Sequence, residues 1–379
     1  MSIDALEDIE GSLAGRVGLR LDPTFRTRLH RGVREESAAA GLSLSGYSLA
    51  IERDPEMFQR LLNRVTIQHT WFFRDPDVFT AIATEVIPTL GDPIVAWSAG
   101  CSNGQEAYSL AMVLDESGRK DWTVLGTDVS TDALGRARSG VYTATEVKSL
   151  SRERLSRHLT ASSGQWEIRP ELKKRVRFGH HNLTSEAAPI TIGSGSIVMC
   201  RNVLIYFNRE DLVRVLGRVE SAMRPDGYLF LGGSESLWQR SDRFQLTRVG
   251  SAFGYRLLAA PVAQERRRVA TAVAKDMRRP SSIASLRGLA EAAAAAGDFA
   301  AAAANLRHAT HIDPDQPVLH FQLALCLERA GQPEAARLAL EASRSSIARC
   351  EEARVEAALE GFRPRELEQE IERRLRHKP

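Results

Sequence analysis

The stretch Ile94-Val-Ala-Trp-Ser-Ala-Gly-Cys-Ser-Asn-Gly-Gln-Glu-Ala-Tyr-Ser-Leu-Ala111 decides the fold class of this chain. A short apolar run leads into a loop of small residues, Ser98–Gly104, and the pattern then becomes helical. This order predicts a strand, a tight turn and a helix N-terminus, where backbone N–H groups can approach a ligand closely. The alternative is an ordinary turn between a strand and a helix that happens to be rich in small residues.

A second apolar run, Trp122–Leu125, ends at Gly126-Thr-Asp128. An acidic side chain at the tip of the second strand of an α/β unit is well placed to bind two ribose hydroxyls. The loop after the first strand is not G-x-G-x-x-G, and no Gly-Lys-Ser/Thr follows it. We therefore expect a nucleoside without a long phosphate chain as the ligand, and Asp128 as its ribose contact.

Length and composition are those of a multidomain globular protein. The chain has 379 residues, of which 43% are hydrophobic and 26% charged, enough for two or three domains with cores of their own. No run approaches the roughly eighteen apolar residues of a membrane span, and the acidic N-terminus does not resemble a signal peptide. We therefore expect a protein that is not inserted in a membrane.

The cysteines and the net charge narrow the class further. Four cysteines stand far apart without a C-x-x-C pair, which indicates reduced thiols in a cytoplasmic protein and neither a disulfide framework nor a metal site. A formal net charge of +3 is too small to indicate nucleic acid as a partner of the whole chain.

The pattern along the chain predicts four segments. Residues 1–85 form an N-terminal helical domain, 86–260 an α/β domain, 261–282 an Arg- and Pro-rich linker, and 283–379 an all-α module. In the α/β segment, helical patterns alternate with apolar runs, which are Ile94–Trp97, Thr123–Leu125, Val176–Phe178, Ser196–Cys200, Tyr228–Leu231, Phe244–Val249 and Phe253–Leu258. This alternation predicts a mostly parallel sheet with helices on both faces, and the last two runs predict a hairpin with an antiparallel edge strand.

The C-terminal module contains a repeat. Gly297-Asp-Phe-Ala300 and Gly331-Gln-Pro-Glu334 begin 34 residues apart, and Leu289 matches Leu323 at the same offset. A 34-residue period with small residues at close-contact positions is typical of tetratricopeptide (TPR) repeats. Because two repeats are few for a solenoid, we expect capping helices over residues 351–375. The alternative is an Ala-rich helical bundle with accidental spacing.

Three further segments carry polar and aromatic residues in unusual combinations. They are Thr66-Ile-Gln-His-Thr-Trp-Phe-Phe-Arg-Asp-Pro76, Phe178-Gly-His-His-Asn-Leu183 and Val198-Met-Cys-Arg-Asn-Val-Leu-Ile-Tyr-Phe207. Polar groups at the carboxyl end of a central strand lie where α/β sheets bind ligands. Together with the loop after Trp97 and the Thr127-Asp128 turn, these segments resemble the CheR family of chemoreceptor glutamate O-methyltransferases over roughly residues 10–258.

The resemblance implies a Rossmann-like, S-adenosylmethionine-dependent methyltransferase whose product is S-adenosylhomocysteine. Carried over residue by residue, it implies cofactor contacts from Gln68, Thr70, Arg74, Glu106, Asp128, Asn182, Leu183, Arg201 and Asn202. Gln68 stands where the family often has Asn. Arg74 and Tyr206 would lie beside the methyl group and the incoming carboxylate, which makes them the expected catalytic residues.

The family chemistry requires no general base. A glutamate side chain with a pKa of about 4.3 is already an anionic nucleophile near neutral pH. In-line placement and exclusion of water are what the transfer needs, and a guanidinium and a phenol hydroxyl can orient a carboxylate by donating hydrogen bonds. We therefore expect His180 and His181 to be surface or strand-end residues.

A helix over residues 23–36 is the expected receptor-binding element. Phe25, Leu29 and Val33 form one apolar face, and Arg28, Arg31 and Arg34 lie opposite. The arginines are either a solvated basic face or a surface that guides a glutamate-rich receptor helix. An insert within 150–178 contains Gln165-Trp-Glu-Ile168 and predicts a small β-subdomain, which in some family members binds a receptor's C-terminal peptide.

Three functions remain open at this stage. The favoured one is a cytoplasmic methyltransferase acting on chemoreceptor cytoplasmic helices or a related chemosensory array, with an unidentified protein partner for the TPR module. The second is a methyltransferase for another substrate class, against which the Arg-Asn-Val-Leu-Ile-Tyr-Phe segment argues. The third is a catalytically idle cofactor-binding scaffold that acts through its TPR module.

Overall fold

The computed structural model describes residues 2–21, 23–191, 193–232, 235, 237, 241, 243–258, 283–349 and 364–376. The chain divides into two compact units, residues 1–232 and 233–379. The predicted linker, 261–282, lies outside the described residues.

The first unit begins with helices that enclose a core of their own. They are α1 (Ser2–Val17), α2 (Pro23–Ala39), α3 (Leu44–Arg53) and α4 (Pro55–Val65). Asp54 caps α4 by accepting hydrogen bonds from the backbone N–H groups of Glu56 and Met57. Phe25, Leu29 and Val33 are buried in this core, so the apolar face predicted for the second helix is confirmed.

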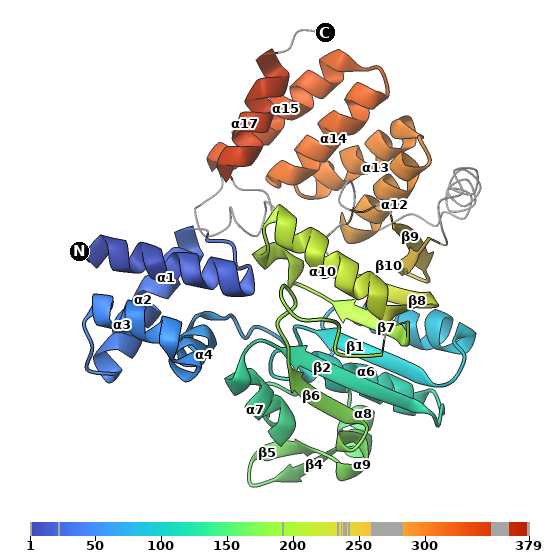
Figure 1. Ribbon diagram of the computed structural model, residues 1–379. Helices are drawn as coiled ribbons and strands as arrows, with labels where there is room; N and C mark the ends of the chain where they lie inside the picture. The colour runs from blue at the N-terminus through green and yellow to red at the C-terminus, as the bar shows by residue number, and fades with distance from the viewer. Residues whose placement is uncertain are drawn as a thin grey trace. The chain divides into compact units, whose positions relative to one another are not determined.

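A parallel sheet follows, as the alternation of apolar runs predicts. After α5 (Pro76–Ala81), a π-helical turn (Ile82–Val86) and a 3-10 turn (Ile87–Thr89), the strands of the first unit lie side by side in the order β6-β2-β1-β7-β8 (Figure 1). Their bounds are β1 Ile94–Ala99, β2 Trp122–Asp128, β6 Val176–His180, β7 Gly195–Cys200 and β8 Met223–Leu231. Each neighbouring pair is parallel, and β7 is buried along its whole length, as expected for a central parallel strand.

The crossovers between these strands are helical. They are α6 (Gln105–Glu116), α7 (Thr131–Ser139) and α10 (Arg209–Ala222), with the 3-10 turn η3 (Leu204–Tyr206) before α10. Because all strands run in the same direction, the segments that follow β1, β2, β6 and β7 meet at one edge of the sheet. Seven of the predicted site residues lie at the ends of these strands or in the segments that follow them, namely Glu106, Asp128, Asn182, Leu183, Arg201, Asn202 and Tyr206.

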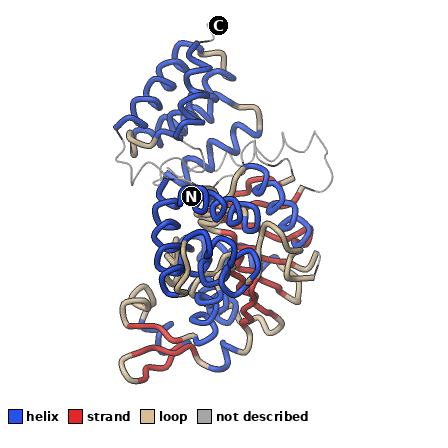
Figure 2. The backbone as a smooth tube through the Cα atoms, turned by 60° about the vertical axis from the view of Figure 1, so that its left-hand side comes forward, coloured by secondary structure: helices blue, strands red, loops and turns tan. Residues whose placement is uncertain are grey.

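The segment between α7 and β6 forms a second, smaller sheet. Its strands β3 (Val141–Thr143), β5 (Gln165–Ile168) and β4 (Leu159–Ser162) pair in an antiparallel manner in that order. Helices α8 (Arg152–His158) and α9 (Pro170–Lys173) flank it. Figure 2 shows these short strands apart from the main sheet, and the Gln165–Ile168 run is the middle strand.

The second unit contains a hairpin and a helical array. The predicted hairpin is confirmed, because β9 (Phe244–Val249) and β10 (Ala252–Leu257) pair in an antiparallel manner. The hairpin contacts the first helix of the array, since a Cβ added to Gly288 would lie 2.6 Å from the Phe253 ring.

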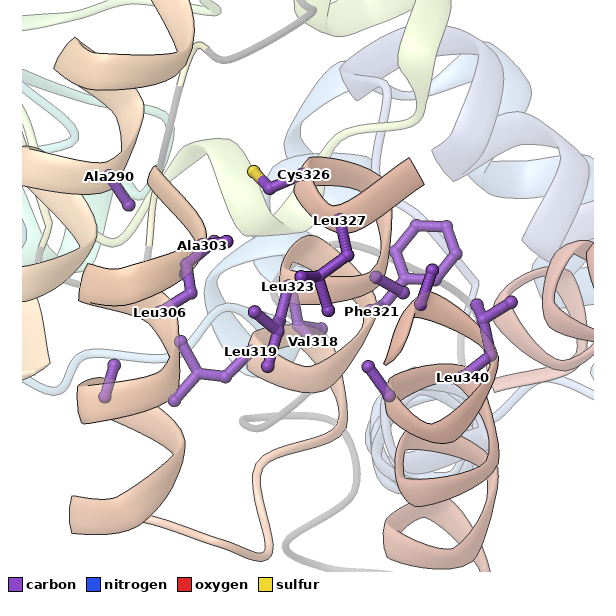
Figure 3. Packing of buried hydrophobic residues seen from close by; sticks show 14 of the residues in the cluster. Ala290, Ala303, Leu306, Val318, Leu319, Phe321, Leu323, Cys326, Leu327 and Leu340 are labelled. Carbon is purple, nitrogen blue, oxygen red and sulfur yellow. The ribbon is translucent and has the colours of Figure 1, made fainter. Parts of the chain in front are cut away.

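The array has the periodicity that the sequence predicts. Its helices are α12 (Ile283–Ala295), α13 (Phe299–Ile312), α14 (Pro317–Arg329), α15 (Pro333–Arg349) and α17 (Pro364–Arg376). Gly297 and Gly331 occupy the same left-handed turn position, with φ of +80° and +71°. Leucines and alanines from neighbouring helices of the array interdigitate in the space between the helices (Figure 3). The predicted fold class, a Rossmann-like sheet with N-terminal helices and a TPR-like tail, is therefore confirmed.

Candidate active site

The loop after β1 is bound to the end of β2. The backbone N–H groups of Gly100 and Cys101 both donate to the carbonyl oxygen of Thr127, each at 2.8 Å. Gly100 has φ of +79°, and a Cβ there would lie 2.5 Å from a methyl group of Val203. Only glycine fits between this turn and the segment after β7, which explains the Ala-Gly-Cys sequence.

Asp128 lies at the carboxyl end of β2, as the sequence predicts. Its two carboxylate oxygens accept hydrogen bonds from the backbone N–H groups of Ser102, at 2.8 Å, and Ser130, at 2.9 Å. Burial raises the pKa of this carboxyl above its ordinary value, although these backbone hydrogen bonds oppose the shift. A carboxylate offers about four acceptor positions, so Asp128 has capacity for two ribose hydroxyls in addition.

Gln68 contacts the same loop. Its side-chain oxygen accepts a hydrogen bond from the Ser102 hydroxyl at 2.6 Å, and its Nε2 donates to the Thr66 hydroxyl at 3.1 Å. Thr70 is half-buried two residues further on. The structure therefore places Gln68 beside the loop and gives both of its polar atoms a protein partner.

Glu106 and Arg201, both expected cofactor contacts, bind each other. Arg201 follows β7 and its side chain is only 1% exposed, and its guanidinium contacts Glu106 on α6 at 3.3 Å. The same guanidinium also donates to a carboxylate oxygen of Asp75, and the Ser98 hydroxyl donates to Glu106 at 2.8 Å. The buried positive charge thus has two carboxylate partners, as a buried charge requires.

Arg74 projects from a strained turn. Phe73 and Asp75, on either side of it, have φ of 52° and 57°, a left-handed conformation that is uncommon for a bulky residue and frequent at functional sites. The guanidinium of Arg154 lies 3.8 Å from the Phe73 ring centroid, and that of Arg74 lies 4.5 Å from the Trp71 ring centroid. Arg74 is half-buried, and its guanidinium donates to the carbonyl oxygen of His69 at 3.3 Å.

The Asn182-Leu183 pair follows β6 and contacts the N-terminal helices. The Asn182 side chain donates to the carbonyl oxygen of Arg16 at 2.7 Å and accepts from the backbone N–H of Thr184. Leu183 is buried. Of the two preceding histidines, His180 is exposed and His181 is buried, with burial lowering the pKa of His181.

Asn202 and Tyr206 lie in the segment after β7. Asn202 has φ of 59°, a left-handed conformation that asparagine tolerates better than most residues. Tyr206 is half-buried, and its carbonyl oxygen accepts a hydrogen bond from the backbone N–H of Arg20 at 2.7 Å. The chain between α1 and α2 therefore lies directly beside the expected catalytic tyrosine.

The three arginines of α2 that the sequence predicts to face the receptor differ in exposure. Arg31 and Arg34 are exposed, whereas Arg28 is half-buried, with its guanidinium 5.4 Å from the Phe25 ring centroid. The exposed pair forms a basic surface on the helical domain.

Sequence reasoning missed three residues that shape this edge. Asp75 follows the predicted site residue Arg74, and Ser102 lies in the loop after the first strand. Their position in these motifs was the only sequence feature that could have indicated them. Asn63 on α4 hydrogen-bonds to the turn after Asp128, and nothing in the local pattern predicts that contact.

Comparison with known proteins shows the family of this chain. The family described as CheR methyltransferase, SAM binding domain, matches residues 68–253, and a tetratricopeptide repeat family matches residues 293–359. The chain is 34% identical over 211 residues to chemotaxis protein methyltransferase Cher2 of Pseudomonas putida, covering 52% of this chain and 76% of that protein. The chain belongs to the CheR methyltransferase family.

Other relatives have similar sequence identity to this chain, but the matched region covers very different shares of their length. Chemotaxis protein methyltransferase 1 of Pseudomonas aeruginosa is 35% identical over 212 residues, which cover 52% of this chain and 77% of the relative. An uncharacterized 104.1 kDa protein of Rhodobacter capsulatus is 38% identical over 252 residues, which cover 62% of this chain and only 25% of that protein. The chain therefore spans about three quarters of the chemotaxis relatives and a quarter of the larger protein.

The residues present fit S-adenosylmethionine, the cofactor of the family. Its ribose diol suits the acceptor positions that Asp128 has in addition to its two backbone hydrogen bonds. Among the described residues no cluster of His, Cys, Asp or Glu could bind a metal ion. Within that part of the chain, too, no helix has the length and apolar character needed to span a membrane.

Proposed function

We propose that the protein is an S-adenosylmethionine-dependent protein-glutamate O-methyltransferase of the cytoplasm. Its substrates would be glutamates on the cytoplasmic helices of chemoreceptors or of a related chemosensory array, and its products glutamate methyl esters and S-adenosylhomocysteine. The observation that carries the proposal is the position of Asp128 at the end of β2 and of the Glu106–Arg201 pair after β1 and β7, all at the carboxyl edge of a CheR-family sheet. The chemotaxis names of the relatives support the receptor class of substrate.

The residues of this edge have distinct expected roles. When bound, S-adenosylmethionine supplies a methyl group on a positively charged sulfur. Asp128 binds the ribose hydroxyls, and Glu106 and Arg201 contact the amino-acid end, with Gln68, Thr70, Asn182, Leu183 and Asn202 completing the cofactor site.

Arg74 and Tyr206 would orient the incoming carboxylate. The substrate glutamate is ionised at neutral pH, so neither residue needs to accept a proton. Both can donate hydrogen bonds to a carboxylate oxygen and leave its other lone pair directed at the methyl group. The exposed Arg31 and Arg34 on α2 would form a basic surface that binds an acidic receptor helix. The TPR module would bind a segment of a different protein partner.

Methyl transfer from labelled S-adenosylmethionine to receptors in membranes tests this proposal. We expect base-labile label, as for a methyl ester, and lower single-turnover rates for Tyr206→Phe with nearly unchanged S-adenosylhomocysteine affinity. Asp128→Ala should weaken S-adenosylhomocysteine binding by roughly 1.5–3 kcal/mol, because charge-assisted hydrogen bonds are lost. Base-stable label, or a Tyr206→Phe enzyme with the wild-type rate, would contradict the corresponding assignment.

A further inference from the structure

The C-terminal end of helix α4 is hydrogen-bonded to the turn that follows Asp128. The Asn63 side-chain oxygen accepts from the Ser130 hydroxyl at 3.2 Å and from the Thr131 backbone N–H at 2.9 Å. The Asn63 amide nitrogen donates to the Thr131 hydroxyl at 2.8 Å. Gln59, one turn earlier on α4, donates to the Val129 carbonyl oxygen at 2.9 Å. The helical domain therefore contacts three consecutive residues immediately after the proposed ribose-binding acid.

A second set of bonds returns from the cofactor loop to the same end of α4. Ser102 donates its backbone N–H to Asp128 and its hydroxyl to Gln68. Gln68 in turn donates to the Thr66 hydroxyl, which donates to the Asn63 carbonyl oxygen at 3.4 Å.

These bonds form a closed ring. In order, it runs through Asn63, Ser130, Asp128, Ser102, Gln68 and Thr66 and back to Asn63. Ser102 and Ser130 each take part through a backbone N–H on the side of Asp128 and through a hydroxyl on the other side. The ring therefore fixes the backbone on both sides of Asp128 against α4 and the segment after it. Asp128 is the only carboxylate of the ring, and the turn on each side of it is bonded to α4 or to the segment after α4.

We propose that Asn63 and Thr66 are positioning residues. Through Ser130 on one side and through Gln68 and Ser102 on the other, they hold Asp128 in the geometry required by the cofactor ribose, and so link cofactor binding to docking of the N-terminal helices. The inference rests on the proposed assignment of Asp128. Outer residues that orient a binding group commonly change affinity without touching the ligand. Because linkage is reciprocal, a cofactor that needs the closed ring must also stabilise the docked position of α4.

The helices that the ring holds in place belong to the domain proposed to bind the receptor. Helix α4 belongs to the same core as α2, which presents Arg31 and Arg34. Cofactor binding would therefore order the domain that receives the protein substrate before the carboxylate arrives, and the ring is the physical connection between the two sites.

Calorimetry with S-adenosylhomocysteine tests the positioning role. Thr66→Val removes one hydroxyl from the ring at nearly constant volume, and Thr66→Ser restores it; Asn63→Ala opens the ring on the other side. We expect Asn63→Ala and Thr66→Val to weaken binding about five- to tenfold, the loss of one or so hydrogen bonds, with Thr66→Ser close to wild type. Ser43→Ala, which removes the cap of α3 in the same domain, is the matched control and should keep wild-type affinity.

Hydrogen exchange tests the linkage. Saturating S-adenosylhomocysteine should slow exchange of the α4 amides in the wild type and much less in Thr66→Val. Equal protection in both proteins would overturn the linkage. If Asp128→Ala loses affinity for S-adenosylhomocysteine but Asn63→Ala and Thr66→Val keep the wild-type affinity, the positioning role alone is overturned. Wild-type affinity of Asp128→Ala would overturn the ribose assignment of the proposed function and this inference with it.

Discussion

The carboxyl edge of the sheet and the TPR-like array are stabilised in opposite ways. At the edge, Arg201 is buried between two carboxylates, and directional bonds join segments far apart in the chain. In the array, apolar side chains such as Leu306 and Leu327 pack between neighbouring helices (Figure 3). A polar site loses its geometry when one partner is removed, whereas an apolar array distributes its stability over many contacts.

The largest effect is expected from removing Arg201. Arg201→Ala leaves Glu106, only 13% exposed, without its guanidinium partner, and breaking a buried pair in this way costs about 3–5 kcal/mol. The control is Arg376→Ala in the array, whose Glu372 pair is 78% and 53% exposed and should contribute less than about 1 kcal/mol. Urea unfolding monitored for each unit measures both, and equal effects of the two substitutions would remove the contrast.

A core substitution in the array should be nearly as large and yet stay local. Leu327 is 1% exposed, so Leu327→Ala should destabilise the array by about 3 kcal/mol through the cavity it leaves. Leu338 is 68% exposed, and Leu338→Ala should change stability by less than about 0.5 kcal/mol. Neither variant should change S-adenosylhomocysteine affinity in calorimetry. Loss of that affinity in Leu327→Ala would show that the array contributes to the cofactor site.

Acid stability should depend on Glu116. Burial opposes its ionisation, but hydrogen bonds from His158 and Arg154 and the charge of Arg154 outweigh burial and lower the pKa of Glu116 to about 2. A depressed carboxyl pKa stabilises the fold above the unfolded-state pKa of about 4.3. The difference between the two pKa values corresponds to about 3 kcal/mol, which solvent screening of a side chain that is 25% exposed reduces to roughly 2 kcal/mol. This stability is lost as the pH falls from 4.3 towards 2. In Glu116→Gln the free energy of unfolding should therefore fall less steeply over this acid range.

The corresponding control lies in the array. Glu370, whose pKa is also lowered, chiefly by a hydrogen bond from Arg373, is 32% exposed and pairs with the exposed Arg373 and the half-buried Arg374. Glu370→Gln should change the loss of unfolding free energy at acid pH less than Glu116→Gln does. A steeper loss of acid stability in the wild type than in Glu116→Gln is the required result, and parallel curves would contradict it.

The smallest effect is expected on the exposed surface of α2. Arg31→Glu should leave stability and cofactor affinity unchanged and lower receptor methylation at low salt. The gap to wild type should narrow as the Debye length falls from about 10 Å at 0.1 M to about 3 Å at 1 M. Arg344→Glu makes the same charge change at an exposed site of the array. A salt-independent loss, or an equal loss in Arg344→Glu, would argue against guidance by the α2 arginines.

Sequence reasoning located the site better than it described it. Asp128 lies at the end of β2, and Arg201 and Asn202 directly follow β7, because strand ends can be recognised where apolar runs stop. The pairing of Arg201 with Asp75 joins residues 126 positions apart, and that of Asn63 with Ser130 spans 67 positions. No local pattern encodes such partners.

The sequence by itself therefore determined the features that recur at a regular spacing along the chain. The alternating strands, the apolar face of α2 at Phe25, Leu29 and Val33, and the 34-residue repeat follow from the regular geometry of helices and strands. Tertiary structure alone decided which polar atoms meet. A hydrogen bond forms only within a few tenths of an ångström and a narrow range of angles, and that precision arises from how the helical domain, the loop after β1 and the turn after β2 pack together.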